Sequence, residues 1–198
     1  MQTSLYRYRL ISYWRNIDKK IFFCFLTLFF LGLFFSYSST SSLAGERLNK
    51  DFYFFFSKHL IFALLALVIM IFLSALKTSL LKKIVLPLFI LSFISLALVP
   101  IIGVEVKGAK RWLDFTFFRL QPIEILKPFF ILITVQILTF EKLVHSQVKY
   151  FLSFLLLSLV IILLIDQPDL GQSILLIGSW VATVFISGAS LFYIISFL

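Results

Sequence analysis

The sequence predicts an all-α fold, a polytopic bundle of transmembrane helices, and its composition supports this prediction. Hydrophobic residues make up 61% of the 198 residues, 26 residues are Phe, and the mean hydropathy is +1.07, well above the values of soluble domains. The apolar stretches lack the polar face of a helix in a soluble core. They also lack the alternation of barrel strands, and only a helix satisfies its own backbone within one lipid-embedded segment.

Long uncharged runs define the predicted spans. Most of them approach the roughly 20 residues that cross about 30 Å of hydrocarbon. The uncharged runs cover residues 21–45, 60–76, 84–104, 150–165 and 170–198. Allowing for their ends, and adding the apolar stretch 123–140 with its Glu124 and Lys127, the predicted spans are 21–38, 59–76, 84–102, 123–140, 150–165 and 170–187, with a seventh beginning near residue 191.

The end of the chain indicates six complete spans plus the start of a seventh. Residues 187–190, Ser-Gly-Ala-Ser, predict a tight turn, and only eight residues follow. At about 1.5 Å per residue these cover roughly 12 Å, less than half of a bilayer. We therefore expect the chain to be part of a longer protein. The alternative is one long tilted helix over residues 170–198.

Basic residues predict the orientation. Five Lys and Arg precede the first apolar run, which lacks a small-residue cleavage site and is predicted to be an uncleaved span. The connections 1–20, 77–83 and 141–149 together carry ten basic residues, against eight on the opposite side. The positive-inside rule then places the N-terminus in the cytoplasm and the loops 39–58, 103–122 and 166–169 outside. Residues 1–20 form a cytoplasmic basic segment, and 21–198 belong to one transmembrane domain.

Several classes of site find no support in the sequence. The net charge of +9 does not indicate nucleic acid as a partner, because the basic residues lie at the ends of apolar runs. His59 and His145 have no ligand partners at metal-binding spacing, so no metal site is predicted. No cofactor motif is evident. Cys24 lies inside the first apolar run and cannot form an internal disulfide.

The segment 121–128 could carry polar chemistry at a membrane boundary. Pro122 suits the first turn of a helix, and Glu124 is favoured there by the helix dipole. Lys127 follows at i+3 on the same face, while Pro128 cannot donate to the Glu124 carbonyl and predicts a kink. This pattern, with Gln121, is typical of the lining of a polar cavity. An interfacial ion pair without a chemical role fits the spacing equally well.

The loop before this helix is basic. Lys110, Arg111 and Arg119 could bind phosphate or pyrophosphate groups at a lipid surface, since Arg binds them bidentately. Alternatively, they form a solvated loop and pair with Glu105 and Asp114.

Asp166 and Asp169 flank Pro168 between the last two runs. Asp169 could cap the following helix. It could also pair with the basic loop at 107–119, and the two roles are compatible.

Three motifs in this order give a family resemblance. GAKRW (108–112), RLQPIEILK (119–127) and DQPDLGQS (166–173), separated by hydrophobic runs, resemble the shape, elongation, division and sporulation family, the FtsW/RodA-type membrane proteins. The Ser-rich GLFFSYSSTSS (32–42) is also similar to the family's exit from its first helix. Ile123 departs from the family pattern, which usually has Ser there. The resemblance covers the N-terminal half of a fold with about ten spans.

The resemblance implies a peptidoglycan glycosyltransferase that polymerises lipid II, the disaccharide-pentapeptide on undecaprenyl pyrophosphate, outside the bacterial cytoplasmic membrane. It implies a class B transpeptidase (a penicillin-binding protein) and other division proteins as partners. The family's presumed catalytic aspartate would lie beyond residue 198, so these residues alone are expected to be inactive as a polymerase. The residues matching family motifs at the expected substrate-binding cavity are Lys110, Arg111, Gln121, Glu124, Lys127 and Asp169.

Within the family, the motifs favour the division-type FtsW branch over the elongation-type RodA branch, which remains the alternative. Two other classes of function compete with the polymerase. One is a lipid II transporter or flippase, whose polar groups would line a path across the membrane. The other is a non-enzymatic scaffold for division proteins. The charged residues gather at the outer ends of spans, and the interiors at 60–76 and 84–102 are uncharged, which favours a one-sided site.

Overall fold

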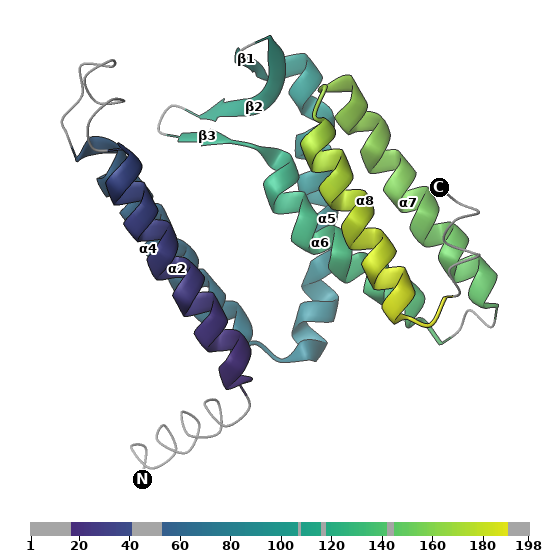
Figure 1. Ribbon diagram of the computed structural model, residues 1–198. Helices are drawn as coiled ribbons and strands as arrows, with labels where there is room; N and C mark the ends of the chain where they lie inside the picture. Colours follow the sequence, from purple (N-terminus) through teal and green to yellow (C-terminus); the bar gives the residue numbers. More distant parts are fainter. Residues whose placement is uncertain (1–16, 41–52, 107, 116–117, 142–144, 190–198) are drawn as a thin grey trace. The chain divides into compact units, whose positions relative to one another are not determined.

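A computed structural model describes residues 17–40, 53–106, 108–115, 118–141 and 145–189 (Figure 1). The chain divides into two compact units, residues 1–77 and 78–198, and each unit is described by itself. The helices that the structure describes correspond to the six predicted spans, so the predicted polytopic helical fold is confirmed.

The first unit contains α2 (Lys19–Thr40) and α4 (Phe54–Ser74), which pack against each other. Asp18 begins α2, because its carboxylate accepts hydrogen bonds from the backbone N–H groups of Lys20 and Ile21 at 2.9 and 3.2 Å. None of the residues in either helix's most apolar 18-residue window is buried inside the protein. Helices that are apolar on all sides and unburied fit a lipid environment.

The second unit contains four helices and three short strands. The helices are α5 (Thr78–Ile102), α6 (Pro122–Leu138), α7 (Ser146–Asp166) and α8 (Leu170–Ile186). Within the described residues, α2, α4, α5 and α7 are long and apolar enough to cross a membrane. Helices α6 and α8 have 17 residues each, about 25 Å at 1.5 Å per residue, the lower limit of a span.

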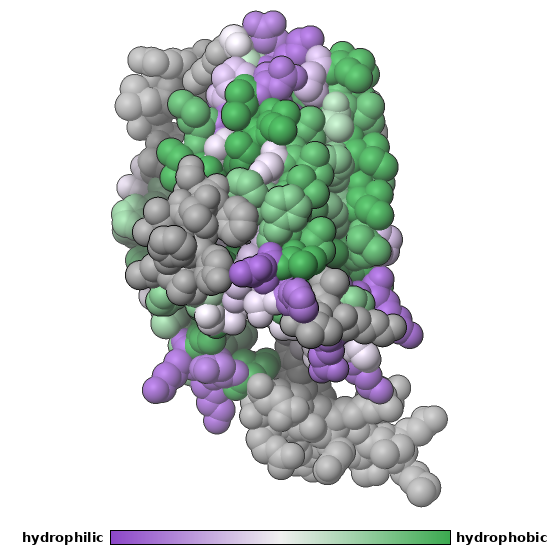
Figure 2. All heavy atoms as spheres, turned by 90° about the vertical axis from the view of Figure 1, so that its right-hand side faces the viewer, coloured by the Kyte–Doolittle hydropathy of each residue, from purple (hydrophilic) through white to green (hydrophobic). Residues whose placement is uncertain are grey.

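Helix α6 lies at the centre of the second unit and packs against α5, α7 and α8. Its inward face carries Leu126 and Phe130, both fully buried. Leu96 of α5, Val160 of α7 and Trp180 of α8 are equally buried and complete the core. Figure 2 shows hydrophobic side chains over the middle of the visible face and hydrophilic ones above and below it, as expected of helices in a bilayer.

A hydrogen bond joins α7 and α8 inside this core. The indole Nε1–H of Trp180 donates to the Ser153 hydroxyl at 3.2 Å, and both side chains are fully buried. The Ser153 hydroxyl in turn donates to the Tyr150 carbonyl at 2.8 Å. This pair satisfies an indole donor that would otherwise be buried without an acceptor.

The connection between α5 and α6, predicted only as an outer loop, forms a three-stranded antiparallel sheet. Its strands are β1 (Val104–Val106), β2 (Ala109–Phe115) and β3 (Phe118–Leu120), in the order β1-β2-β3. Gly108 has φ +81° in the β1–β2 turn, a conformation that glycine adopts without strain. The sequence did not predict this sheet, because its strands are short and their charged residues interrupt the alternation of apolar and polar residues that marks a strand.

The end of α8 agrees with the predicted turn. The helix ends at Ile186, and Gly188 follows with φ +94°. A single helix over residues 170–198 is therefore excluded. The predicted seventh span near residue 191 lies outside the described residues.

We predict that Ser153→Ala destabilises the second unit by about 1 kcal/mol, because the Trp180 indole N–H loses its buried acceptor. Thermal unfolding in detergent, followed by near-UV circular dichroism, measures this effect. The control is Ser158→Ala further along α7, where the hydroxyl donates to its own helix at the Phe154 carbonyl. Equal melting temperatures for the two variants would contradict the assigned role of Ser153.

Candidate functional site

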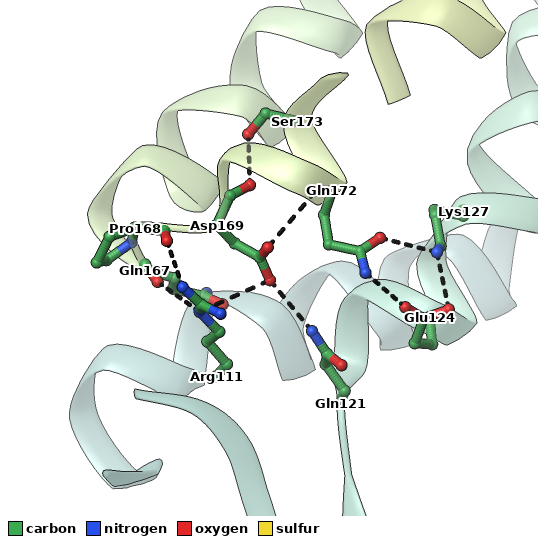
Figure 3. Close-up of polar contacts among 9 residues, drawn as sticks. All are labelled: Arg111, Gln121, Glu124, Lys127, Gln167, Pro168, Asp169, Gln172 and Ser173. Carbon is green, nitrogen blue, oxygen red and sulfur yellow. Dashed lines mark hydrogen bonds and ion pairs between the residues drawn. The ribbon is translucent and has the colours of Figure 1, made fainter. Parts of the chain in front are cut away.

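A cluster of polar side chains lies at one end of the second unit, where β2 and β3 meet the start of α6 and the α7–α8 connection (Figure 3). Its members come from segments about 50 residues apart in the sequence. The residues of this polar cluster are Arg111, Gln121, Glu124, Lys127, Gln167, Pro168, Asp169, Gln172 and Ser173.

Asp169 is the residue that joins most parts of the cluster. Its carboxylate accepts a hydrogen bond from the Gln172 backbone N–H at 3.5 Å and so caps the N-terminus of α8. The same carboxylate accepts a hydrogen bond from Gln121 Nε2 at 3.1 Å and lies 3.8 Å from Arg111 Nε. Asp169 is only 8% exposed. Both roles considered for Asp169 in the sequence, capping and pairing with the basic loop, are therefore present together.

Arg111 holds the α7–α8 connection against strand β2. Its Nε donates to the Gln167 carbonyl at 3.3 Å, and its Nη2 donates to the Pro168 carbonyl. Gln167 is itself buried, and its Nε2 donates to the Leu96 carbonyl of α5 at 3.1 Å. A lysine could not replace this arrangement, because only the planar guanidinium presents several donors in a fixed fork.

Glu124 and Lys127 form the second half of the cluster. Lys127 Nζ lies 2.7 Å from Glu124 Oε2, which confirms the predicted i,i+3 ion pair. The Gln172 side chain closes the network, since its Oε1 accepts from Lys127 at 2.8 Å and its Nε2 donates to Glu124 at 2.7 Å. Gln172 thus connects the two halves of the cluster, because its side chain binds the ion pair of α6 and its backbone N–H binds Asp169.

Five of the six predicted site residues share this network, and Lys110 does not. Lys110 Nζ donates to the Pro100 carbonyl of α5 at 3.4 Å. Lys110 and Arg111 are neighbours in a strand, so their side chains point to opposite faces of the sheet. Arg119 pairs with Asp114 at 3.1 Å across the β2–β3 hairpin, as the solvated-loop alternative predicted.

The glutamines Gln167 and Gln172 belong to the polar cluster but are not among the site residues predicted from the sequence. Both lie close to Asp169 in DQPDLGQS, and an amide can donate and accept at once, which suits a bridge between a cation and a carboxylate. Gln172 follows the N-cap residue Asp169 by three positions, which is where a helix-capping side chain finds its backbone N–H. This spacing could have indicated from the sequence that Gln172 lies beside Asp169.

The charges of the cluster balance. Arg111 and Lys127 supply two cations, and Glu124 and Asp169 supply two carboxylates, each within ion-pair distance of a cation. In the part of the chain that the structure describes, no group of three or more His, Cys, Asp or Glu could hold a metal ion. The cluster is therefore a set of oriented donors held by carboxylates, which suits recognition of an anionic group by hydrogen bonds.

A sequence model of the FTSW_RODA_SPOVE family, described as cell cycle proteins, matches residues 18–198. The chain belongs to this family. The probable peptidoglycan glycosyltransferase FtsW of Marinomonas mediterranea is 31% identical over 163 residues, which are 80% of this chain and 40% of the relative. That of Escherichia coli O6:H1 is also 31% identical, over 81% of this chain and 39% of the relative. The chain thus spans less than half the length of these relatives.

Solved structures support the same assignment. The rod shape determining protein RodA of Thermus thermophilus is 26% identical, with a TM-score of 0.63 over 84% of this chain and 57% of that protein. A chain from a peptidoglycan synthase complex, described as coordinating polymerization and crosslinking, is 25% identical, with a TM-score of 0.70 over 86% of this chain and 49% of that chain.

We predict that Asp169→Ala lowers the stability of the second unit by about 1 kcal/mol or more, because the variant loses the α8 cap and leaves Arg111 without its carboxylate. Asp169→Asn should recover only the part of this loss that comes from the α8 cap, since Asn caps a helix about as well as Asp but leaves Arg111 without a carboxylate. Chemical unfolding in detergent compares the two variants.

The control is Asp166→Ala, which removes an exposed carboxylate three residues before Asp169, at the end of α7. If Asp166→Ala and Asp169→Ala destabilise the protein equally, the cap and the contact with Arg111 contribute nothing specific.

Proposed function

We propose that this chain is the N-terminal part of a peptidoglycan glycosyltransferase that polymerises lipid II, and that the polar cluster binds the pyrophosphate-linked substrate. The observation that carries the proposal is the network in which Arg111, Gln121 and Asp169 are joined to Glu124 and Lys127 by Gln172. The names of the FtsW relatives support the same activity.

The chemistry of the reaction fits such a cluster. An acceptor hydroxyl attacks the anomeric carbon of the donor sugar, the bond to the pyrophosphate oxygen breaks, and the hydroxyl proton passes to a base. The leaving pyrophosphate gains negative charge, which oriented cationic donors stabilise. The carboxylates then have a positioning role, because they hold the two cations before the substrate arrives and lower the cost of ordering them.

Individual donors can be assigned to this task. Lys127 has three N–H donors, and the contacts with Gln172 and Glu124 use two of them. Arg111 has five, and its side chain is 37% exposed. Each cation can therefore bind a phosphate oxygen while keeping its carboxylate partner. Gln121 completes the set as a neutral donor, and Lys110 would act, if at all, from the other face of the sheet.

The location of the cluster supports a one-sided site. All of its residues lie at one end of the helices, and the basic residues of the connections at the opposite end favour a cluster outside the cytoplasmic membrane, with the N-terminus in the cytoplasm. A flippase would need polar groups along its path. In α5, the side-chain hydroxyls of Ser92 and Ser95 donate to carbonyls of their own helix. The hydroxyl donors in the middle of this helix are therefore already used and do not favour the passage of a charged headgroup.

The division-type branch is the preferred assignment within this proposal, since the FtsW relatives are about 30% identical. The likeness to RodA keeps an elongation-type, cell-shape enzyme as the second candidate. The neighbour from a complex of polymerization and crosslinking supports a class B transpeptidase as partner, with other division proteins around it.

We predict that the purified chain binds fluorescent lipid II in detergent and that Lys127→Met weakens this binding roughly 10- to 100-fold, because a hydrogen bond to a charged group contributes about 1.5–3 kcal/mol. Titration by fluorescence anisotropy gives the dissociation constants. The control is Arg119→Ala, which removes an exposed cation of the same loop outside the cluster and should change binding less than about twofold. Equal effects of the two variants would refute specific recognition by the cluster.

We predict further that residues 1–189 joined to the remaining C-terminal part of the Escherichia coli relative polymerise lipid II in liposomes, and that Glu124→Gln slows this at least about tenfold while its melting temperature stays within a few degrees. Gel analysis of labelled glycan strands measures the rate. Translocation of labelled lipid II without polymer would favour the transporter, and partner binding without either activity would favour the scaffold.

A further inference from the structure

Two adjoining cavities lie at the opposite end of the second unit, where α6 ends and α5 begins. The first has a volume of about 360 Å³ and a mixed polar and apolar lining of Lys82, Gln136, Thr139, Phe140 and Glu141. The second has a volume of about 310 Å³ and an apolar lining. Its residues are Leu86, Ile133, Gln136, Ile137, Phe140 and Leu152. Gln136 and Phe140 line both cavities, so the polar cavity continues into the apolar one.

The apolar cavity lies among α5, α6 and α7 on a surface that is open to lipid. Leu86 is 53% exposed, and Phe140 is 49% exposed. Such a continuous polar and apolar lining matches an amphiphile whose headgroup lies at the membrane boundary and whose chain runs along the helices. Polar pockets between transmembrane helices near the membrane boundary are places where lipid headgroups bind.

The charges of the polar cavity are mixed. Its lining contains one cation, Lys82, and one carboxylate, Glu141. Lys82 lies near the N-terminus of α5, the positive end of that helix dipole, while Thr139 is the C-cap of α6, the negative end of its dipole. The two helices are held together here by the Gln136 Nε2 hydrogen bond to the Lys82 carbonyl at 3.2 Å. An anion is thus favoured on one side of the cavity and a cation on the other.

We propose that these joined cavities bind one zwitterionic phospholipid with a primary ammonium headgroup, that is, phosphatidylethanolamine. The phosphate binds Lys82 at the start of α5. The ammonium group donates to Glu141 and to carbonyl oxygens in the last turn of α6, whose second lone pair can accept it. One acyl chain follows the apolar cavity between Leu86 and Leu152.

This assignment separates three lipids by their chemistry. Phosphatidylglycerol offers the phosphate without a cation, so Glu141 repels it. Phosphatidylcholine carries a quaternary ammonium that cannot donate hydrogen bonds to a carboxylate or to backbone carbonyls. Of the three, phosphatidylethanolamine alone complements both sides of the cavity. The site lies at the other end of α6 from the polar cluster and is independent of the proposed polymerase activity.

The test is native mass spectrometry of the full chain released from nanodiscs that contain equal amounts of the three lipids. We expect retained phosphatidylethanolamine to exceed phosphatidylglycerol at least about fivefold, the effect of roughly one charge-assisted contact. Lys82→Ala should reduce its retention by a similar factor. The matched control is Lys83→Ala, which removes the neighbouring cation outside the cavity lining and should leave retention unchanged.

Glu141→Gln provides a second, independent variant. It should abolish the preference and raise retention of phosphatidylglycerol, because the repulsive carboxylate is gone while Lys82 remains. Equal retention of all three lipids by the unmodified chain would overturn the proposal. So would equal effects of Lys82→Ala and Lys83→Ala, or a preference for phosphatidylethanolamine that survives in Glu141→Gln.

Discussion

The Asp169 carboxylate is the constraint on which the candidate site depends. It is nearly buried, and a buried charge is tolerated only where opposite charge and hydrogen-bond donors surround it. The α8 N-terminus, Gln121 and Arg111 supply these donors from three separate segments. Each segment is thereby held at the same end of the helices. Arg111 on β2 and Gln121 at the start of α6 are thereby tied to one buried group.

The balance of charges explains why the cluster uses glutamine. The ion pairs Lys127–Glu124 and Arg111–Asp169 form by direct contact, at 2.7 and 3.8 Å. Gln172 links the two pairs, because its amide accepts from Lys127 and donates to Glu124 while its backbone N–H donates to Asp169. The donors therefore keep defined directions before a substrate binds. Preorganised donors of this kind stabilise developing charge at less cost than flexible side chains do.

The helices could be predicted from the sequence because their signal is strong. Uncharged runs predicted five of the six spans, and the ends of all six lie within six residues of the observed helix ends. The i,i+3 spacing placed Glu124 beside Lys127. The sheet at 104–120 and the separation of Lys110 from Arg111 could not be predicted, since strands of three to seven residues give little periodicity. Gln172 was missed because its amide acts through contacts with Glu124 and Lys127, which exist only once the fold places α6 beside α8.

Helix α6 connects the two ends of the second unit at which polar groups gather. Its first turn carries Glu124, and its last turn lies over the mixed-charge cavity with Gln136 and Thr139. Along the side that faces α5, α7 and α8 it is packed tightly, with Leu126 and Phe130 fully buried. Close packing of this kind leaves little room for the helix to shift. The Gln136 hydrogen bond to the Lys82 carbonyl holds the C-terminal end of α6 against the start of α5, and the Gln172 hydrogen bond to Glu124 holds its first turn against α8, so that α6 is fixed at both ends.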